Sequence, residues 1–203
     1  MVADDQQARH DAASALRELN HRFVGHHRGV DGLRELEAIA KREAAAMRAG
    51  DVRDRVAMSE AWVRSPGEVD SSFEDRAVAG RSNPTGAAIE LARHEDHVVA
   101  SFVLGPADSG FPGRAHGGVV CGLFDEVTGH ALEHLAGRQA FTGEITVRYV
   151  APVPLGEPLT ITSRLDGHEG RKIFLSQELR AGDQVVATCR ATCITPVAPK
   201  NGG

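Results

Sequence analysis

The chain has 203 residues, of which 41% are hydrophobic and 25% are charged. This length suits one sizeable domain or two small ones, and the composition is ordinary for a globular protein, which excludes a wholly disordered chain. The formal net charge is −5. Because basic residues are neither in excess nor clustered, we expect neither a nucleic-acid surface nor a polybasic membrane patch.

The sequence also argues against membrane insertion and a disulfide scaffold. No run of about 18 apolar residues occurs, so no membrane span is expected. The acidic first residues lack the apolar core of a signal peptide. Three cysteines are too few for a disulfide framework, and their spacing matches no zinc pattern. We therefore expect a reduced, cytoplasmic protein.

The first 80 residues have a charged, helical pattern. Apolar residues at three- and four-residue spacings predict helices over 4–20 and 31–49. Asp31 is the expected N-cap of the second helix, and Gly50 is expected to end it. Residues 65–86 are rich in glycine and proline and are expected to form a loop.

After residue 86 the hydrophobic period changes to two, which is typical of strands. A glycine- and proline-rich loop and one apolar helix interrupt this pattern, and such a helix is expected to be buried. The strands are expected over 87–92, 98–104, 141–150, 158–166, 172–181 and 184–195, with the helix over 118–136. We therefore predict an α+β domain in which an antiparallel sheet of five to six strands wraps around one long central helix.

These patterns divide the chain into three parts. Residues 1–80 form a helical N-terminal extension and linker, and residues 81–197 form the sheet-and-helix domain. Residues 198–203 are expected to be a disordered tail.

The most informative segment begins with His116, Gly117 and Gly118 at the start of the expected central helix. Two glycines let a ligand approach the backbone, and the unpaired N–H groups and dipole of a first helical turn favour developing negative charge. A thioester carbonyl placed there would be polarised. Asp125 lies about two turns further along and could act as a general base or as a nucleophile. On the residues alone, tight packing of the glycines and a solvated Asp125 remain an equal alternative.

Two further motifs accompany this segment. Asn83-Pro84-Thr85-Gly86 precedes it, and the strand that begins at Thr142-Gly143-Glu144 follows it and leads into Pro152-Val153-Pro154-Leu155-Gly156. In this order, residues 81–195 resemble the hotdog-fold acyl-CoA thioesterases of the phenylacetate-type branch. The resemblance implies a hotdog thioesterase domain that hydrolyses acyl-CoA.

The resemblance also implies roles for individual residues. Gly117, with Gly118, would offer backbone N–H groups to the thioester oxygen, and Asp125 would be the nucleophile or general base. His116 would hold the loop geometry, and Thr142 from a second subunit would help to position water or the carboxylate. Several relatives carry Asn or Gln on the loop before the two glycines, and this sequence has neither there.

The resemblance further implies how the protein assembles and what it binds. Members of this family form homodimers or dimers of dimers with sites at the subunit interface. Coenzyme A would enter as part of the substrate, with no other cofactor and no metal. Arg148, Arg171 and Lys172 could bind coenzyme A phosphates, because cationic side chains suit phosphate, or could simply be exposed.

Several other polar residues have a structural interpretation beside a functional one. His130 and His134 have a possible metal spacing, but without an HExxH pattern they are better explained as polar residues near the end of the helix. Glu126 is expected to face solvent or to pair with His130. The three cysteines, Cys121, Cys189 and Cys193, are expected to be core residues rather than catalytic thiols.

Two other functions compete with hydrolysis. A non-catalytic acyl-CoA binder could use the N-terminal helices to reach a partner. A hotdog enoyl-CoA hydratase would need a histidine near its Asn-Pro turn, and Asn83-Pro84 has none close by. DNA binding is disfavoured, because residues 1–80 carry 12 Arg and Lys against 15 Asp and Glu.

Overall fold

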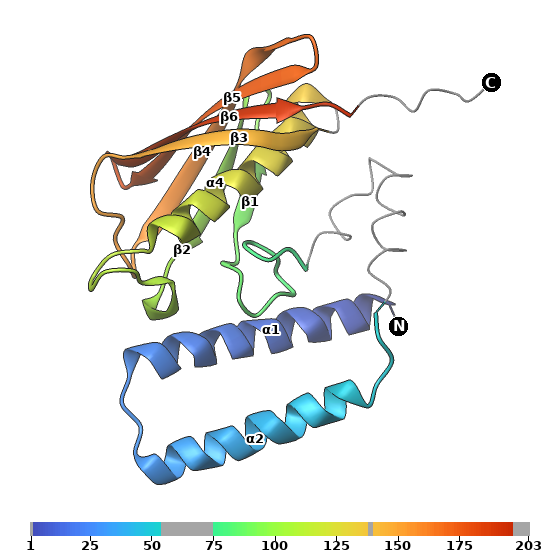
Figure 1. Ribbon diagram of the computed structural model, residues 1–203, viewed down its shortest axis with the longest axis vertical. Coiled ribbons are helices and arrows are strands. Elements are labelled where there is room, and N and C mark those ends of the chain that lie inside the picture. The colour runs from blue at the N-terminus through green and yellow to red at the C-terminus, as the bar shows by residue number, and fades with distance from the viewer. Residues whose placement is uncertain (1, 54–74, 138–139, 197–203) are drawn as a thin grey trace, which may run out of the picture.

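The computed structural model describes residues 2–53, 75–137 and 140–196. In this part of the chain, two N-terminal helices lie beside a domain made of one sheet and one long helix (Figure 1). The elements are α1 (Val2–Gly25), α2 (Val30–Arg48), β1 (Glu90–Arg93), β2 (His97–Val103), η2 (Pro106–Asp108), α4 (Gly117–Ala131), η3 (Leu132–Ala136), β3 (Phe141–Tyr149), β4 (Pro158–Glu169), β5 (Lys172–Ala181) and β6 (Gln184–Ile194). The expected tail over 198–203 lies outside the described residues.

The six described strands form one antiparallel sheet in the order β1-β2-β4-β5-β6-β3. The chain leaves β2, passes through α4 and enters β3 at the opposite edge. It then returns to β4, beside β2, and two hairpins fill the space between. This arrangement confirms the predicted α+β class and the predicted antiparallel sheet around one central helix. It also leaves β1 and β3 as the two edge strands.

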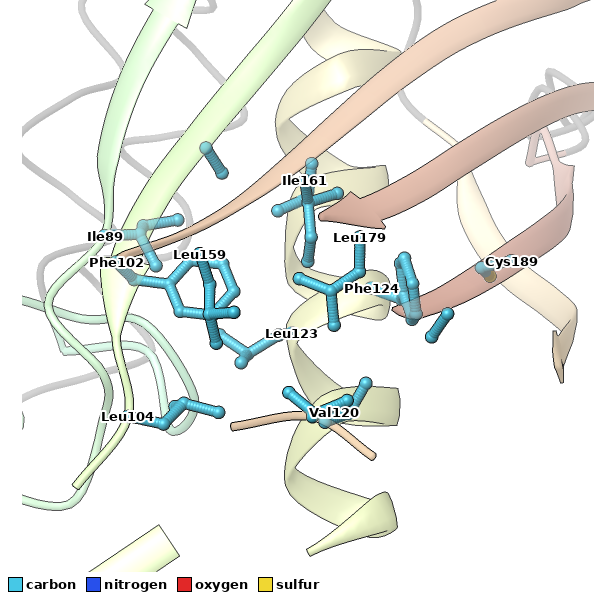
Figure 2. Close-up of a cluster of buried hydrophobic side chains, with 14 of the residues drawn as sticks. Ile89, Phe102, Leu104, Val120, Leu123, Phe124, Leu159, Ile161, Leu179 and Cys189 are labelled. Carbon is cyan, nitrogen blue, oxygen red and sulfur yellow. The ribbon is translucent and has the colours of Figure 1, made fainter. Parts of the chain in front are cut away.

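The core forms where the sheet wraps around α4. Val120, Leu123, Phe124 and Val127 of α4 are almost fully buried, as the spacing of apolar residues predicted. They pack against side chains from β2, β4, β5 and β6, which Figure 2 shows around the helix. Burying each such Leu or Phe contributes about 1.5–3 kcal/mol, so the position of α4 on the sheet is strongly determined.

A buried polar side chain of the sheet, Gln177, forms hydrogen bonds to α4. Gln177 on β5 is 2% exposed, and its Nε2 donates to the Thr128 hydroxyl at 2.6 Å and to the Phe124 carbonyl at 3.1 Å. The Thr128 hydroxyl in turn donates to the same carbonyl. Because buried polar groups need partners, these bonds fix how α4 lies across β5.

The first turn of α2 differs from the sequence prediction. Gly29 is the N-cap, the helix begins at Val30, and Asp31 lies inside the first turn, so the prediction of Asp31 as N-cap was wrong. The carboxylate of Asp31 pairs with Arg34 at 3.3 Å. An acidic side chain in a first turn favours the helix through the dipole without being the cap.

The inward and outward alternation of β3 also differs from the prediction. The pairing of β3 with β6 shifts between Thr142 and Glu144, which marks a β-bulge. A bulge adds one residue to one strand and so changes which face the side chains occupy beyond it. A regular period of two over 141–150 would place Phe141 on the inner face with Ile145, but Phe141 is 68% exposed. Thr142 instead pairs with the buried Cys193 and shares its inner face.

Helix α1 is attached to the domain mainly through polar contacts. The Arg17 guanidinium donates to the carbonyls of Gly86 and Asn83, and His21 Nδ1 accepts from the Ala107 N–H at 3.2 Å. Partial burial lowers the pKa of Arg17 from its usual value. The Asn83 side chain accepts from the Thr85 N–H at 3.0 Å, which holds the turn that presents these carbonyls.

By contrast, none of the 19 described residues of α2 is buried. Within the described ranges, no helix combines the length and the apolar character that crossing a membrane requires.

Candidate active site

The N-terminus of α4 is capped by a histidine side chain. His116 has an extended backbone, and its Nδ1 accepts from the Gly118 N–H at 2.9 Å. The His116 carbonyl accepts from the N–H groups of Val119 and Val120. Among the described residues, the Gly117 N–H has no hydrogen-bond partner. Of the two glycines, Gly117 therefore offers the free backbone donor, while Gly118 uses its donor for the cap.

Tyr149, the last residue of β3, contacts this first turn directly. Its hydroxyl donates to the Gly117 carbonyl at 2.6 Å. A Cβ atom on Gly117 would lie 3.1 Å from the same hydroxyl oxygen, which is tighter than an ordinary contact. Burial raises the pKa of Tyr149 and keeps its hydroxyl protonated as a donor. The sequence reasoning gave Tyr149 no role, and its place at the end of a strand was its only signal.

A cavity of about 390 Å³ opens beside the free N–H group. That volume falls within the range of small-molecule sites. Its wall is largely apolar, and Arg114 contributes a cation. The lining residues are Arg114, Ala115, Gly117, Val120, Tyr149 and residues 150–153. A ligand in this cavity would meet the Gly117 N–H at the positive end of α4.

Neither Asp125 nor Thr142 lines this cavity. The Asp125 charge contributes to the raised pKa of both Cys189 and Cys193, which places the carboxylate on the side of α4 nearest β6. Thr142 pairs with Cys193 across the strands. Asp125 itself is exposed. The rise of a helix separates Gly117 from Asp125 by about 12 Å. Thr142 and Tyr149 are about 23 Å apart along β3.

Within one protomer the predicted site residues therefore fall into two groups, which we call half-sites. The first contains Gly117, Tyr149 and the cavity. The second contains Asp125 and Thr142.

The three predicted phosphate-binding residues lie at opposite ends of the sheet, and Arg171 and Lys172 share the end that carries Thr142. Arg148 is exposed, and strand alternation points it to the face opposite Tyr149. Arg171 donates to the Thr195 carbonyl at 2.9 Å. Lys172 begins β5 in register with Ile194, so both lie at the end of the sheet remote from Tyr149.

Glu126, the neighbour of Asp125, is held by an ion pair. Its carboxylate lies 2.6 Å from the Arg76 guanidinium and 3.9 Å from His130 Nε2. The predicted pairing with His130 is confirmed, whereas the solvent-facing alternative was wrong, because only 11% of the side chain is exposed. Arg76 comes from a loop fifty residues earlier, and no sequence pattern connected it with α4. Asp125 is thus the carboxylate of this pair that faces outward.

The remaining candidates have structural surroundings. His134 Nε2 lies 2.8 Å from the His94 carbonyl. Within the described residues, no group of three or more His, Cys, Asp or Glu side chains could hold a metal ion. Cys121 is half-buried, while Cys189 and Cys193 are buried. Burial raises the pKa of Cys189 to about 12 and that of Cys193 to about 11, so both are protonated thiols at neutral pH.

Comparison with known proteins shows that part of the chain is similar to thioesterases. Residues 112–188 match the model of the Thioesterase superfamily. The predicted resemblance to this superfamily is thus confirmed. The chain is 36% identical over 100 residues to acyl-coenzyme A thioesterase THEM4 of Xenopus laevis. The aligned region covers 49% of this chain and 45% of that protein. THEM4 of Bos taurus is 36% identical over 98 residues, or 48% of this chain and 40% of that protein. The chain therefore spans less than half the length of these relatives.

Solved structures confirm the hotdog fold. A crystal structure of a thioesterase superfamily protein covers 92% of this chain and 90% of its own, with a TM-score of 0.75 and 24% identity. A hypothetical thioesterase protein with coenzyme A from Streptococcus pneumoniae TIGR4 covers 53% of this chain and 87% of its own, with a TM-score of 0.50 and 20% identity. A Streptococcus mutans UA159 protein bound to acetyl CoA covers 55% of this chain and 91% of its own, with a TM-score of 0.50 and 24% identity. The 92% coverage extends beyond residues 81–197, so part of the N-terminal region shares the likeness.

The reactivity of the cysteines tests the conclusion that Cys189 and Cys193 are buried, protonated thiols. With an aromatic disulfide reagent at pH 8, the folded protein should release at most one equivalent of chromophore, from Cys121. Cys189 and Cys193 have pKa values raised to about 12 and about 11, and so lack thiolate at that pH. All three thiols should react in denaturant, and a Cys121→Ser variant should react only then. Rapid reaction of two or more thiols in the folded protein would contradict this assignment.

Proposed function

We propose that this protein hydrolyses an acyl-CoA thioester to a free acid and coenzyme A. The observation that carries the proposal is the free Gly117 N–H at the start of α4, beside a cavity of about 390 Å³. The named relatives are acyl-coenzyme A thioesterases, and two structural neighbours hold coenzyme A or acetyl CoA. Coenzyme A enters as part of the substrate, and the reaction needs no other cofactor. The expected cytoplasmic location stays a prediction.

The Gly117 N–H polarises the thioester. A carbonyl oxygen placed against this donor gains negative charge as the tetrahedral intermediate forms, and the helix dipole favours that charge. The cavity wall of Val120 and residues 150–153 then receives the acyl or pantetheine chain. His116 holds the loop by capping Gly118, so its role is in geometry.

Asp125 supplies the carboxylate for the attack. As a general base it takes a proton from water, and the hydroxide forms a bond to the thioester carbon. The intermediate then collapses, the carbon–sulfur bond breaks, and the coenzyme A thiolate leaves and takes up a proton. Direct attack by the carboxylate would instead give an anhydride that water opens. Both routes use the same residue, and an Asp125 variant tests them together.

A second copy of the chain completes the site. About 12 Å of helix separates Gly117 from Asp125, more than one carbonyl group can bridge. Among the described strands, β3 has no partner on its outer edge, and its Phe141 and Tyr149 are 68% and 49% exposed. Antiparallel pairing of two β3 edges about a two-fold axis near the strand centre would bring Thr142 of one copy opposite Tyr149 of the other. The homodimer or dimer of dimers then joins complementary half-sites.

Replacing the carboxylate should abolish turnover. Asp125→Asn keeps the size of the side chain but removes its basicity, so kcat for thiol release from a panel of acyl-CoAs should fall by about 100-fold or more. Asp183→Asn, at the exposed turn before β6, is the matched control and should leave kcat unchanged. Unchanged activity of Asp125→Asn would exclude the assigned role. Tight acyl-CoA binding without turnover by the wild type would favour the non-catalytic binder.

Proline at position 117 removes the N–H group and puts its ring Cδ atom in place of the amide hydrogen. Gly117 is the first helical residue, where proline is tolerated, and His116 before it has the extended backbone that a following proline requires. Gly117→Pro should lower kcat by about 100-fold, the typical cost of losing one oxyanion donor. Gly117→Ala adds a comparable Cβ near Tyr149 but keeps the N–H, so it should lose much less. Equal losses in both variants would show that crowding, rather than the donor, matters.

Mixing the two inactive variants tests the shared site. When Gly117→Pro and Asp125→Asn proteins exchange subunits, each heterodimer contains two sites. One of these sites has an intact Gly117 from one copy and an intact Asp125 from the other. Random exchange should restore about a quarter of wild-type activity, since half the dimers are mixed and half their sites are intact. No recovery, despite heterodimers seen by native mass spectrometry, would place both groups within one protomer.

A further inference from the structure

We propose that Tyr149 is a positioning residue that fixes the peptide group between Gly117 and Gly118 and thereby aims the free Gly117 N–H. This inference rests on the proposed thioesterase function. It concerns a residue that touches neither the carboxylate nor, in this arrangement, the thioester oxygen.

The peptide group between the two glycines is held at both of its polar ends. The Gly117 carbonyl and the Gly118 N–H belong to this one group. The Tyr149 hydroxyl donates to its oxygen at 2.6 Å, and His116 Nδ1 accepts from its nitrogen at 2.9 Å. The two restraints come from separate elements, the end of β3 and the residue before α4. We call this arrangement the peptide clamp.

The clamp acts at the weakest point of the helix. A peptide group flanked by two glycines rotates more easily than any other, because neither residue has a Cβ atom to restrict it. It also lies in the first helical turn, whose N–H groups have no intrahelical acceptor. Without the clamp this peptide group would tilt more freely, and the preceding N–H would lose its direction. Oxyanion stabilisation depends on a donor that is already oriented.

Tyr149 is suited to this task by its place on the sheet. Its strand pairs with β6 at Ala187, which is fully buried, so the ring is carried by ordered backbone. The hydroxyl has one proton to donate, and that proton is directed to the Gly117 carbonyl. Tyr149 therefore cannot at the same time donate to a thioester oxygen. A chain of polarised bonds from Tyr149 through the peptide group to His116 also strengthens each member.

The test removes the hydroxyl alone. In Tyr149→Phe, kcat for acyl-CoA hydrolysis should fall by about 10-fold while KM changes less than about 2-fold, because the donor is misaimed but the cavity is kept. Amide hydrogen exchange should quicken by about 10-fold for residues 118–120, since a lost restraint raises local opening. Exchange in β4 and β5 should stay unchanged, which checks that the variant is folded.

A matched control separates the clamp from general loss of a hydroxyl. Ser176→Ala removes another hydroxyl whose hydrogen bond, to Asp166, is also 2.6 Å long but lies on the exposed β4–β5 hairpin. It should change neither kcat nor exchange at residues 118–120. Wild-type kcat or wild-type exchange in Tyr149→Phe would overturn the proposal. If the wild type hydrolyses no acyl-CoA, the proposed function fails, and exchange alone still decides whether the clamp exists.

Discussion

The burial of α4 against the curved sheet is the constraint on which the remaining features depend. Its apolar face is covered by strands of the sheet, and the hydrogen bonds from Gln177 set how it lies across β5. A helix held in this way can present polar groups only at its ends and along its uncovered side. The Gly117 N–H occupies the first of these places, and Asp125 occupies the second. The chemistry of the site thus follows from how the helix is packed.

The same packing separates the two groups that the proposed reaction uses. Both lie on one rigid helix, so no local adjustment can bring Asp125 to a carbonyl bound at Gly117. The strand order of the sheet allows a second copy to complete the site, because it leaves β3 as an edge strand whose ends carry Thr142 and Tyr149. In the proposed dimer, one rigid half-site is completed by another, and neither copy has to deform.

The N-terminal helices are not held by apolar burial as α4 is. Helix α1 is attached mainly through Arg17 and His21 to backbone groups of the loops beside α4, and none of the described residues of α2 is buried. Polar contacts to loops contribute less than apolar burial, so these helices add to the domain without determining its core. The turn at Asn83 is one of the loops that α1 contacts. Its role in this chain therefore includes anchoring the extension.

The sequence by itself determined the fold class, the order of the elements and the segment from His116 to Asp125. Hydrophobic period and glycine placement are local properties, and they identified the buried helix and its open N-terminus. Only the tertiary structure decided which groups are free. The His116 cap occupies the Gly118 N–H, Arg76 occupies Glu126, and the bulge in β3 turns Thr142 inward and Phe141 outward. Tyr149 reaches Gly117 from 32 residues away. These choices depend on contacts between distant segments and on strand register, and periodicity along the chain contains no information about either.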